Sequence, residues 1–243
     1  MILTTATIKG GTGKTTTAAA LAQAAAADGK KVLAIDLDAQ ASLTYILKGE
    51  ETQWGSYGVL HGEMPANCIQ TTDQGIDLMA GCSDLAIENT GKGSSKRLQE
   101  ALEPIKGGYD LIVIDTPPTM GELTFNALQA STGLIIPLEA DRNSLPGLYR
   151  IIDIAKMTQG SNPQLKILGT VITRYDKRPQ LRRFMRDVIA KQGEEAGAPL
   201  LMEIRQGVAL QEAQAMQLSL YEYAPKSNPA QDYRALYEIV SKG

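Results

Sequence analysis

The sequence predicts an α/β fold: a doubly wound, mostly parallel sheet flanked by helices. Apolar, β-branched segments with the length of buried strands recur along the 243 residues, and segments with helical spacing separate them. The first of these strands also runs directly into a glycine-rich loop that opens a helix. Because neither an internal repeat nor a linker divides the chain, we expect residues 1–243 to form a single domain.

In the first half of the chain, strand signals alternate with one clear helix. Residues 1–8 (MILTTATI) are rich in β-branched residues, which favours a buried strand. Small side chains dominate 15–28, so we expect a helix that lies close to the sheet and ends at a glycine. The run 31–36 (KVLAID) predicts the second strand, and 76–80 (IDLMA) predicts another. The glycine- and serine-rich stretch 91–95 predicts a loop inside the domain.

The second half repeats this alternation. Residues 109–118 (YDLIVIDTPP) predict a buried strand followed by a turn. Segments 133–139 and 165–173 predict two further strands, with a helix at 144–158 between them. The apolar spacing over 179–192 is that of an amphipathic helix. The last expected strand and helix are 199–203 and 229–241.

The composition excludes several classes of function. With a net charge of −3 the whole chain is no polycation, so contact with nucleic acid requires a local basic patch. Cys68 and Cys82 lack CxxC spacing, which indicates a reducing compartment and argues against a disulfide framework or a metal cluster. His61 is the only histidine, so no His-based metal site or catalytic triad can be built. No signal peptide precedes the first strand and no apolar run approaches the ~20 residues of a membrane span, so we expect a cytoplasmic protein.

The glycine-rich loop after the first strand reads IKGGTGKTTT, residues 8–17. It nearly matches the phosphate-binding motif GxxxxGK[ST], but Ile8 replaces the first glycine and Lys9 is added. Backbone N–H groups of such a loop cradle phosphates, Lys14 reaches the β- and γ-phosphates, and the Thr15 hydroxyl ligates Mg²⁺. A plain glycine-rich turn is the alternative. The predicted nucleotide-binding residues of this loop are Lys9, Gly10, Gly11, Thr12, Gly13, Lys14, Thr15 and Thr16.

Two carboxylate segments are expected at the same edge of the sheet as this loop. Asp115 ends the buried strand in VIDTPP, where a phosphate-loop enzyme holds Mg²⁺, usually through water. In DLDAQ (36–40), after the second strand, we assign Asp38 to orienting the attacking water and Asp36 to the outer sphere of the metal. The alternative is that these aspartates only cap turns. The predicted metal residues are therefore Thr15, Asp36 and Asp115.

A local cationic block occurs at RYDKRPQLRRFMRD, residues 174–187. If the segment is helical, its apolar stripe predicts a buried face and its arginines point outward. Such a face can neutralise DNA phosphates without reading bases, whereas a solvated helix face is the alternative. The predicted buried stripe is Leu181, Phe184, Met185, Val188 and Ile189. The predicted DNA-binding residues here are Lys177, Arg178, Arg182, Arg183 and Arg186.

The segments KGGTGKTT, DLDAQ and VIDTPP, in this order and spacing, resemble the deviant Walker A ATPases. Within that group the chain is most similar to the ParA/Soj-type DNA partition ATPases, and the similarity covers nearly its whole length. It includes ILGTVITRYD and the tail EAQAMQLSLYEYAPKSNPAQDYRAL. The resemblance implies that Lys9 is the signature lysine, which reaches across an ATP sandwich dimer to the partner's phosphates and is catalytic together with Lys14 and Asp38. It also implies nucleotide contacts from Thr173, Arg205 and Gln206.

The resemblance further implies a slow ATPase that uses ATP and Mg²⁺. The ATP-bound homodimer would bind double-stranded DNA non-specifically, and a ParB-type centromere-binding partner would stimulate hydrolysis and release. Such a protein is cytoplasmic and nucleoid-associated and does not bind a membrane. Because the chain begins at the first strand, we expect the short form without an N-terminal helix-turn-helix domain, and no operator-specific binding. Lys226, in APKSNP, matches a position where relatives often carry a basic residue near the DNA-facing surface.

The sequence departs from the family pattern at three places. Ala39 stands where relatives usually have proline after the second aspartate. The run 203–213 (EIRQGVALQEA) replaces an Ile-Pro-Arg-Asn segment that contacts adenine, so the base contacts differ. Gln217 and Leu218 replace a Gly-Lys pair.

Other functions of the same superfamily compete with this interpretation. A MinD-like ATPase would need a basic amphipathic C-terminal helix, and YRALYEIVSKG has few cations. An iron–sulfur reductase relative would need a cysteine after Asp115, which is absent. A metabolic kinase or dethiobiotin-synthetase-like enzyme would not need Lys9. An ATPase that positions a protein assembly or receptor array instead of DNA would share the same ATP cycle.

Overall fold

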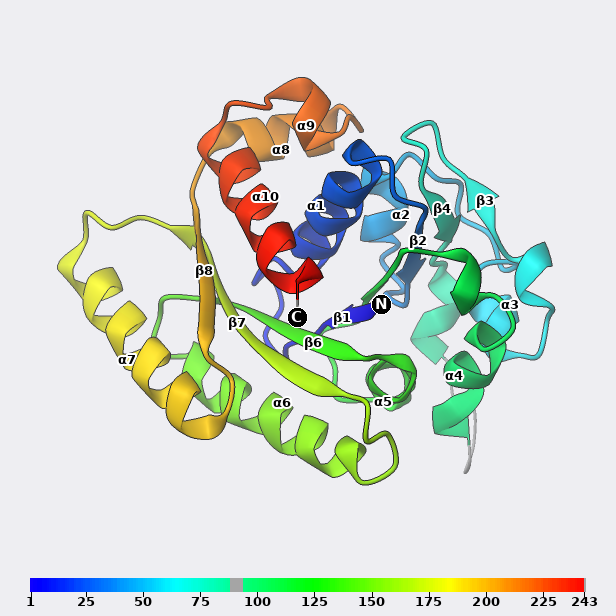
Figure 1. Cartoon of the computed structure of the whole chain (residues 1–243), viewed down its shortest axis with the longest axis horizontal. Helices are drawn as coiled ribbons and strands as arrows, with labels where there is room; N and C mark the ends of the chain where they lie inside the picture. The colour runs from blue at the N-terminus through cyan, green and yellow to red at the C-terminus, as the bar shows by residue number, and fades with distance from the viewer. Residues whose placement is uncertain (88–93, 243) are drawn as a thin grey trace.

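The computed structural model describes residues 1–87 and 94–242. One eight-stranded sheet crosses the molecule in the order β3-β4-β2-β5-β1-β6-β7-β8 (Figure 1). Neighbouring strands are parallel except for β3, which lies antiparallel to β4 at one edge. The predicted mostly parallel sheet is therefore confirmed. The strands are β1 (Ile2–Thr5), β2 (Val32–Asp36), β3 (Gln70–Thr71), β4 (Asp77–Met79), β5 (Leu111–Asp115), β6 (Gly133–Glu139), β7 (Lys166–Tyr175) and β8 (Leu200–Arg205).

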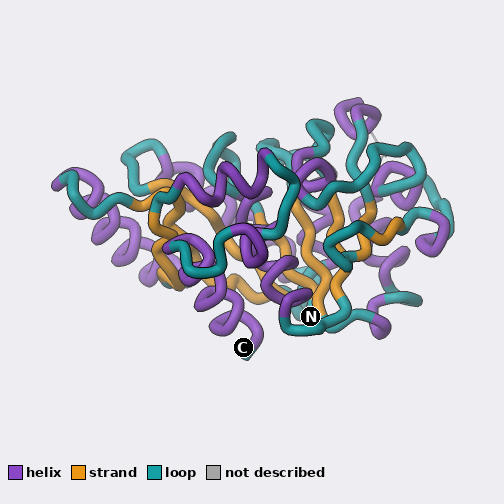
Figure 2. Tube along the Cα trace, turned by 90° about the horizontal axis from the view of Figure 1, so that it is seen from above, coloured by secondary structure: helices purple, strands orange, loops and turns teal. Residues whose placement is uncertain are grey.

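Helices cover both faces of this sheet, as Figure 2 shows from above. Successive strand residues point to opposite faces, so Ala34 and Val113 pack toward α1 and α10 while Leu33 and Ile112 pack toward α4 and α5. The predicted doubly wound architecture is confirmed. The helices are α1 (Lys14–Ala27), α2 (Ser42–Ile46), α3 (Ser56–Leu60), α4 (Arg97–Leu102), α5 (Glu122–Ala130), α6 (Ser144–Gln159), α7 (Gln180–Ala196), α8 (Val208–Ala215), α9 (Leu220–Tyr223) and α10 (Asn228–Ser241).

Helix α1 is the buried helix that the small residues predict. Its alanines from Ala18 to Ala25 are at most 2% exposed, because the sheet lies on one side and α10 and α9 lie on the other. It begins after Gly13, which has φ +88°, and Gly29, with φ +71°, follows its end. The loop before α1 is therefore carried by a helix that is packed on all sides.

The predicted strands and helices agree with the structure in type, with ends displaced by a few residues. Helices α5 and α8 carried no prediction, because polar residues interrupt their apolar spacing. Of the predicted loop 91–95, residues 91–93 lie outside the described residues, and Ser94–Lys96 forms a short 3₁₀ turn.

Candidate functional site

The carboxyl ends of the central strands bring the predicted site residues together. In the register of the sheet, Asp115 lies beside Thr5 on β1 and beside Asp36 on β2. The loop after β1 borders a cavity of about 570 Å³ at this edge, which we call the phosphate cavity. Its lining residues include Gly10, Gly11, Gly13, Lys14, Thr15, Thr16, Asp38, Gln40, Pro118, Arg174 and Gln214. The crevice outside the carboxyl ends of parallel strands is where α/β proteins bind ligands.

The loop has the backbone of a phosphate cradle and is tied to β7. Gly11 and Gly13 have φ values of +74° and +88°, a region that favours glycine. The Thr173 hydroxyl donates hydrogen bonds to the carbonyls of Thr12 at 2.7 Å and Leu138 at 3.3 Å. A Cβ on Gly13 would lie only 3.1 Å from Thr173 Cγ2. The loop therefore holds its shape before any ligand binds, and Thr173 fixes it.

Lys14 is a buried cation that faces carboxylates. Its residue is 6% exposed, and desolvation lowers the pKa of its ammonium group. The charges of Asp115 and Asp38 act in the opposite direction. Lys14 is therefore positioned at the start of α1 to meet anionic groups in the phosphate cavity.

Asp115 has the features of a metal-holding carboxylate. It is fully buried; its Oδ1 accepts a hydrogen bond from the Thr5 hydroxyl at 3.3 Å, and its Oδ2 has no hydrogen-bond partner among the described residues. Burial, together with the charge of Asp36, raises the pKa of Asp115 to about 8, although Thr15 and Lys14 oppose this. A buried oxygen without a donor fits a divalent cation or its water. Asp115 and the Thr15 hydroxyl are thus the residues that would hold Mg²⁺.

Asp36 organises the segment that carries Asp38. Its Oδ1 accepts the Asp38 N–H at 3.1 Å, and its Oδ2 accepts the N–H and hydroxyl of Thr44 at 2.8 and 2.9 Å. Burial raises the pKa of Asp36 to about 6, and these hydrogen bonds oppose the shift. Asp38 lines the phosphate cavity, with Oδ1 accepting the Gln40 N–H at 3.0 Å. The position of Asp38 is therefore fixed from behind by Asp36 and Thr44.

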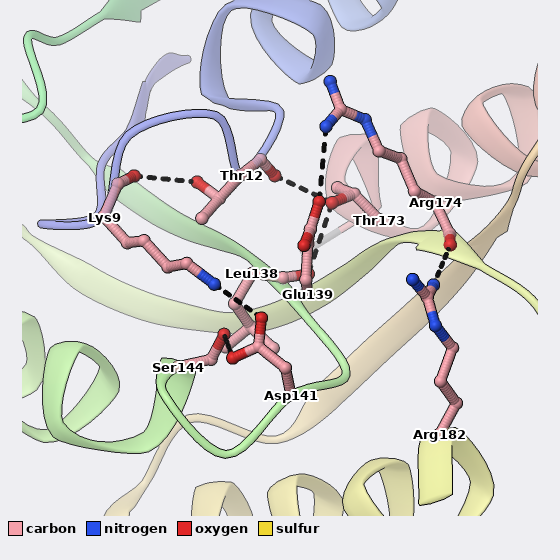
Figure 3. A network of polar contacts seen from close by, with 9 residues as sticks. All are labelled: Lys9, Thr12, Leu138, Glu139, Asp141, Ser144, Thr173, Arg174 and Arg182. Carbon is pink, nitrogen blue, oxygen red and sulfur yellow. Dashed lines mark hydrogen bonds and ion pairs between the residues drawn. The ribbon is translucent and has the colours of Figure 1, made fainter. Parts of the chain in front are cut away.

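Lys9 lies in an ion pair with a residue of the loop between β6 and α6. Its Nζ is 2.5 Å from Asp141 Oδ2, and the Ser144 hydroxyl donates to Asp141 Oδ1 at 3.0 Å (Figure 3). Burial alone would raise the pKa of Asp141, but the hydrogen bonds from Lys9 and Ser144 outweigh it and lower that pKa. Lys9 is not among the described residues that line the phosphate cavity. Its charge is thus held beside the cavity and not in it.

A smaller cavity of about 50 Å³ adjoins the phosphate cavity and contains the other predicted nucleotide contacts. We call it the base cavity; Thr173, Arg205, Gln206 and Tyr233 are among its lining residues. The Arg205 guanidinium is engaged with Asp232, from Nη2 to Oδ1 at 2.7 Å and from Nε to Oδ2 at 2.9 Å. Gln206 carries no such partner among the described residues.

The comparisons with known proteins agree with this geometry. Residues 1–167 match a family described as an AAA domain. The chromosome-partitioning ATPase Soj of Thermus thermophilus is 36% identical over 96% of this chain and 92% of that protein. The chromosome partitioning protein ParA of Caulobacter vibrioides is 35% identical over 99% of this chain and 94% of that protein. The chain belongs to the Soj/ParA family of partition ATPases.

One solved structure that resembles this Soj/ParA chain contains a bound nucleotide. The septum site-determining protein MinD of Pyrococcus horikoshii, complexed with Mg-ADP, is 26% identical and has a TM-score of 0.81. The match covers 99% of this chain and 96% of that one. The predicted family, fold class and cofactors are therefore confirmed: the Soj/ParA chain is a phosphate-loop ATPase that uses ATP and Mg²⁺.

The predicted buried stripe of α7 is partly wrong. Met185 and Ile189 are buried, but Leu181 and Phe184 are 70% and 63% exposed. Both residues lie near the N-terminal end of α7, which extends beyond the sheet (Figure 1). The prediction of a helix is correct, but the buried part of this helix is shorter than its apolar spacing implies.

The cations of residues 174–187 differ in how far they are free to bind an anion from outside the chain. The Arg186 side chain is 37% exposed, but it pairs with Glu203 and Asp187. Arg178 pairs with Asp176, and Arg182 donates to the Arg174 carbonyl at 2.6 Å. Lys177 and Arg183 are exposed and form no ion pair within the described part of the chain. Lys226 is exposed in the turn between α9 and α10, outside this segment.

Three site residues escaped sequence reasoning: Thr44, Asp141 and Arg174. Asp141 acts through Lys9, 132 positions away, whereas Thr44 bonds to Asp36 only eight positions away. Arg174 is the first residue of the cationic block 174–187, but it carried no predicted role at the site. The only sequence signal for Thr44 is its place in the helix directly after DLDAQ. Asp141 follows β6 and Arg174 lies at the carboxyl end of β7, so the rule that sites gather at strand ends could have identified them.

The metal-free protein is expected to lose stability as the pH rises from about 4 to about 8. The folded state raises the pKa of Asp115 to about 8, above the ~3.9 of an unfolded aspartate. The neutral carboxyl therefore stabilises the fold fully below about pH 4, and this stabilisation is lost as the pH rises through 8. Thermal melting in EDTA measures the slope, and Asp115→Asn should flatten it above about pH 6, the raised pKa of Asp36. If the Tm of Asp115→Asn depends on pH as that of the wild type does, Asp115 is not the cause of the pH dependence.

Proposed function

We propose that this chain is an ATP-dependent DNA partition ATPase whose ATP-bound homodimer binds double-stranded DNA without sequence specificity. A ParB-type centromere-binding partner stimulates hydrolysis and releases the DNA. In the cell the protein is then cytoplasmic and associated with the nucleoid. The observation that carries this proposal is the position of Lys9 beside a phosphate cavity that already holds its own lysine, Lys14.

The position of Lys9 supports a role in a second copy of the chain. Lys14 supplies the buried cation that phosphate loops use on their own nucleotide, so a second cation is not required within the chain. Lys9 is 35% exposed at its side chain and bound to one carboxylate, so it can exchange Asp141 for another anion. A phosphoryl group in the partner's site is such an anion. Hydrolysis would then require two ATP-bound chains.

The same geometry supports the proposed catalytic roles. Asp38 reaches into the phosphate cavity and orients the attacking water, Lys14 stabilises the transferred phosphoryl group, and Lys9 of one chain completes the site of the other. Mg²⁺ held by Asp115 and Thr15, with Asp36 behind it, would neutralise charge on the β- and γ-phosphates. The loop residues from Gly10 to Thr16 bind phosphates, and Thr173, Gln206 and Arg205 surround the base cavity.

The proposed DNA surface is formed by the loop before α7 and the N-terminal turn of that helix. Lys177 and Arg183 supply charge that no carboxylate of the described residues neutralises. Arg182 adds charge near them, whereas Arg178 and Arg186 are paired and contribute less. Lys226 is a separate, exposed cation. Because a dimer presents every cation twice, DNA affinity would depend on ATP even though the chain carries a net charge of −3.

Binding to a random-sequence DNA duplex is expected only with ATP·Mg²⁺, and not with ADP or without nucleotide. Asp38→Ala should bind more strongly, because without this carboxylate the ATP state accumulates. Each of Lys177→Ala and Arg183→Ala should reduce the slope of log K against log salt by about one, as expected when one phosphate contact is lost. Fluorescence anisotropy at several salt concentrations measures this.

The matched control for this experiment is Lys166→Ala, an exposed lysine at the opposite end of β7 from the turn before α7. Its salt slope should equal that of the wild type.

Absence of binding in every nucleotide state would exclude an ATP-gated DNA clamp. Vesicles of anionic lipid would then test a MinD-like membrane function; no helix of the described residues is long and apolar enough to span a bilayer. Stimulation of the ATPase by a partner that binds no DNA would instead favour positioning of another cargo.

A further inference from the structure

Arg174 lies where the two halves of a bound nucleotide would meet. The phosphate cavity and the base cavity share four lining residues: Gly13, Thr16, Arg174 and Gln214. A nucleotide that lays its phosphates on the loop and its base toward Gln206 must pass these shared residues with its sugar and α-phosphate. Arg174 is the only cation among the four. Its position therefore matches the α-phosphate better than the γ-phosphate.

The backbone of Arg174 is held in an unusual conformation. Its φ is +50°, in the left-handed region that is uncommon for a residue with a side chain. Contacts on both sides maintain it: Thr173 donates to the Thr12 and Leu138 carbonyls, and Arg182 donates to the Arg174 carbonyl at 2.6 Å (Figure 3). Conformations of this kind persist where the surroundings fix them, and they cluster at ligand sites. Here the conformation places a guanidinium at the rim of both cavities.

The guanidinium of Arg174 is held but not saturated. Its Nη1 donates to Glu139 Oε1 at 3.3 Å, and the side chain remains 52% exposed. One of its five N–H donors is therefore used within the described chain, and the others are available to a ligand. Arg205 differs, because three hydrogen bonds commit its side chain to Asp232. Of the two arginines of the base cavity, Arg174 is the one that can bind an anion without losing a bidentate partner.

We propose that Arg174 is a nucleotide-binding residue that contacts the α-phosphate, and that Glu139 holds its side chain ready beside the cavity. A guanidinium presents paired N–H donors that match phosphate oxygens. The inference rests on nucleotide binding by the loop, and it does not depend on the dimer, on DNA or on a partner protein. Because ATP and ADP both carry the α-phosphate, Arg174 should serve the two nucleotides equally.

The test is the affinity of purified full-length chains for ATP and ADP with Mg²⁺, by calorimetry, in Arg174→Asn. Asparagine tolerates the left-handed backbone, so the variant removes the guanidinium without forcing a new conformation. Both dissociation constants should rise about 10-fold, the effect of one charge-assisted hydrogen bond. Arg150→Asn, at an exposed arginine of α6, should leave both unchanged.

Glu139→Gln provides a second variant that leaves the backbone of residue 174 untouched. It weakens the ion pair that holds Arg174 beside the cavity, so ADP affinity should fall, by less than in Arg174→Asn because the guanidinium remains. Affinities of Arg174→Asn within twofold of the wild type would overturn the inference. A loss for ATP alone would overturn the α-phosphate assignment, and an ADP affinity of Glu139→Gln equal to that of the wild type would overturn the role of Glu139. A wild-type chain that binds neither nucleotide would overturn the proposed function as well.

Discussion

Lys9→Ala is expected to abolish ATP hydrolysis while the single chain still binds ATP with near wild-type affinity. The reason is that Nζ of Lys9 lies in an ion pair with Asp141 and outside its own phosphate cavity. A cation supplied to a phosphoryl group from a second chain typically changes the rate by ~10³–10⁵-fold. Steady-state phosphate release and calorimetric ATP titration measure the two quantities separately.

Asp141→Asn is the natural counterpart of this variant. It removes the carboxylate that holds Lys9, so basal hydrolysis should rise, and the double variant with Lys9→Ala should be as inactive as the single Lys9→Ala. Mixing inactive Lys9→Ala with inactive Asp38→Ala should restore part of the activity if lysine and aspartate act in different chains. Hydrolysis by Lys9→Ala at the wild-type rate would disprove the trans role of this lysine.

Lys14→Met is expected to remove nucleotide binding, with an affinity loss of about 100-fold or more, as for a buried charge left without its partner. Lys14 is almost fully buried at the start of α1, and its desolvation already lowers its pKa before any phosphate binds. The nucleotide-free protein should tolerate the methionine, because a buried cation is replaced by an apolar chain of similar length. The Tm without ligand should therefore change little, while the Tm increase on adding ADP·Mg²⁺ should disappear.

A control for Lys14→Met is Lys156→Met, at an exposed lysine of α6 on the other face of the sheet. It should keep both the Tm and the response to nucleotide. If Lys14→Met binds ADP as tightly as this control, the loop does not bind phosphate in the way proposed here.

The sequence predicted the phosphate loop and the strand-end aspartates because local rules govern them. A glycine at positive φ, a lysine at a helix start and an aspartate at a strand end each act through their immediate neighbours. The doubly wound, mostly parallel sheet followed from the alternation of strand and helix. These features needed no knowledge of distant contacts.

The contacts that fix the site across the fold could not be predicted in the same way. The pairing of Lys9 with Asp141 joins residues 132 positions apart, and the bond from Thr173 to Thr12 spans 161. The prediction that Leu181 and Phe184 are buried was wrong for a related reason. Helical spacing indicates which face of a helix is apolar, whereas the extent of the sheet decides how much of that face is buried. Pairing of Arg186 with Glu203 depends in turn on where β8 lies against α7.

The side chains on the buried part of helix α1 must be small as well as apolar. Its alanines are enclosed between the sheet and α10, and the phosphate loop is attached to its first turn. An added methylene group at such a position costs about 1–3 kcal/mol when it cannot be accommodated, and the helix can only relieve it by moving away from the sheet. That movement would displace Lys14 and Thr15 together. A substitution such as Ala22→Leu is fully apolar and far from any ligand. It should nevertheless reduce activity, and selections for loss of activity should recover it.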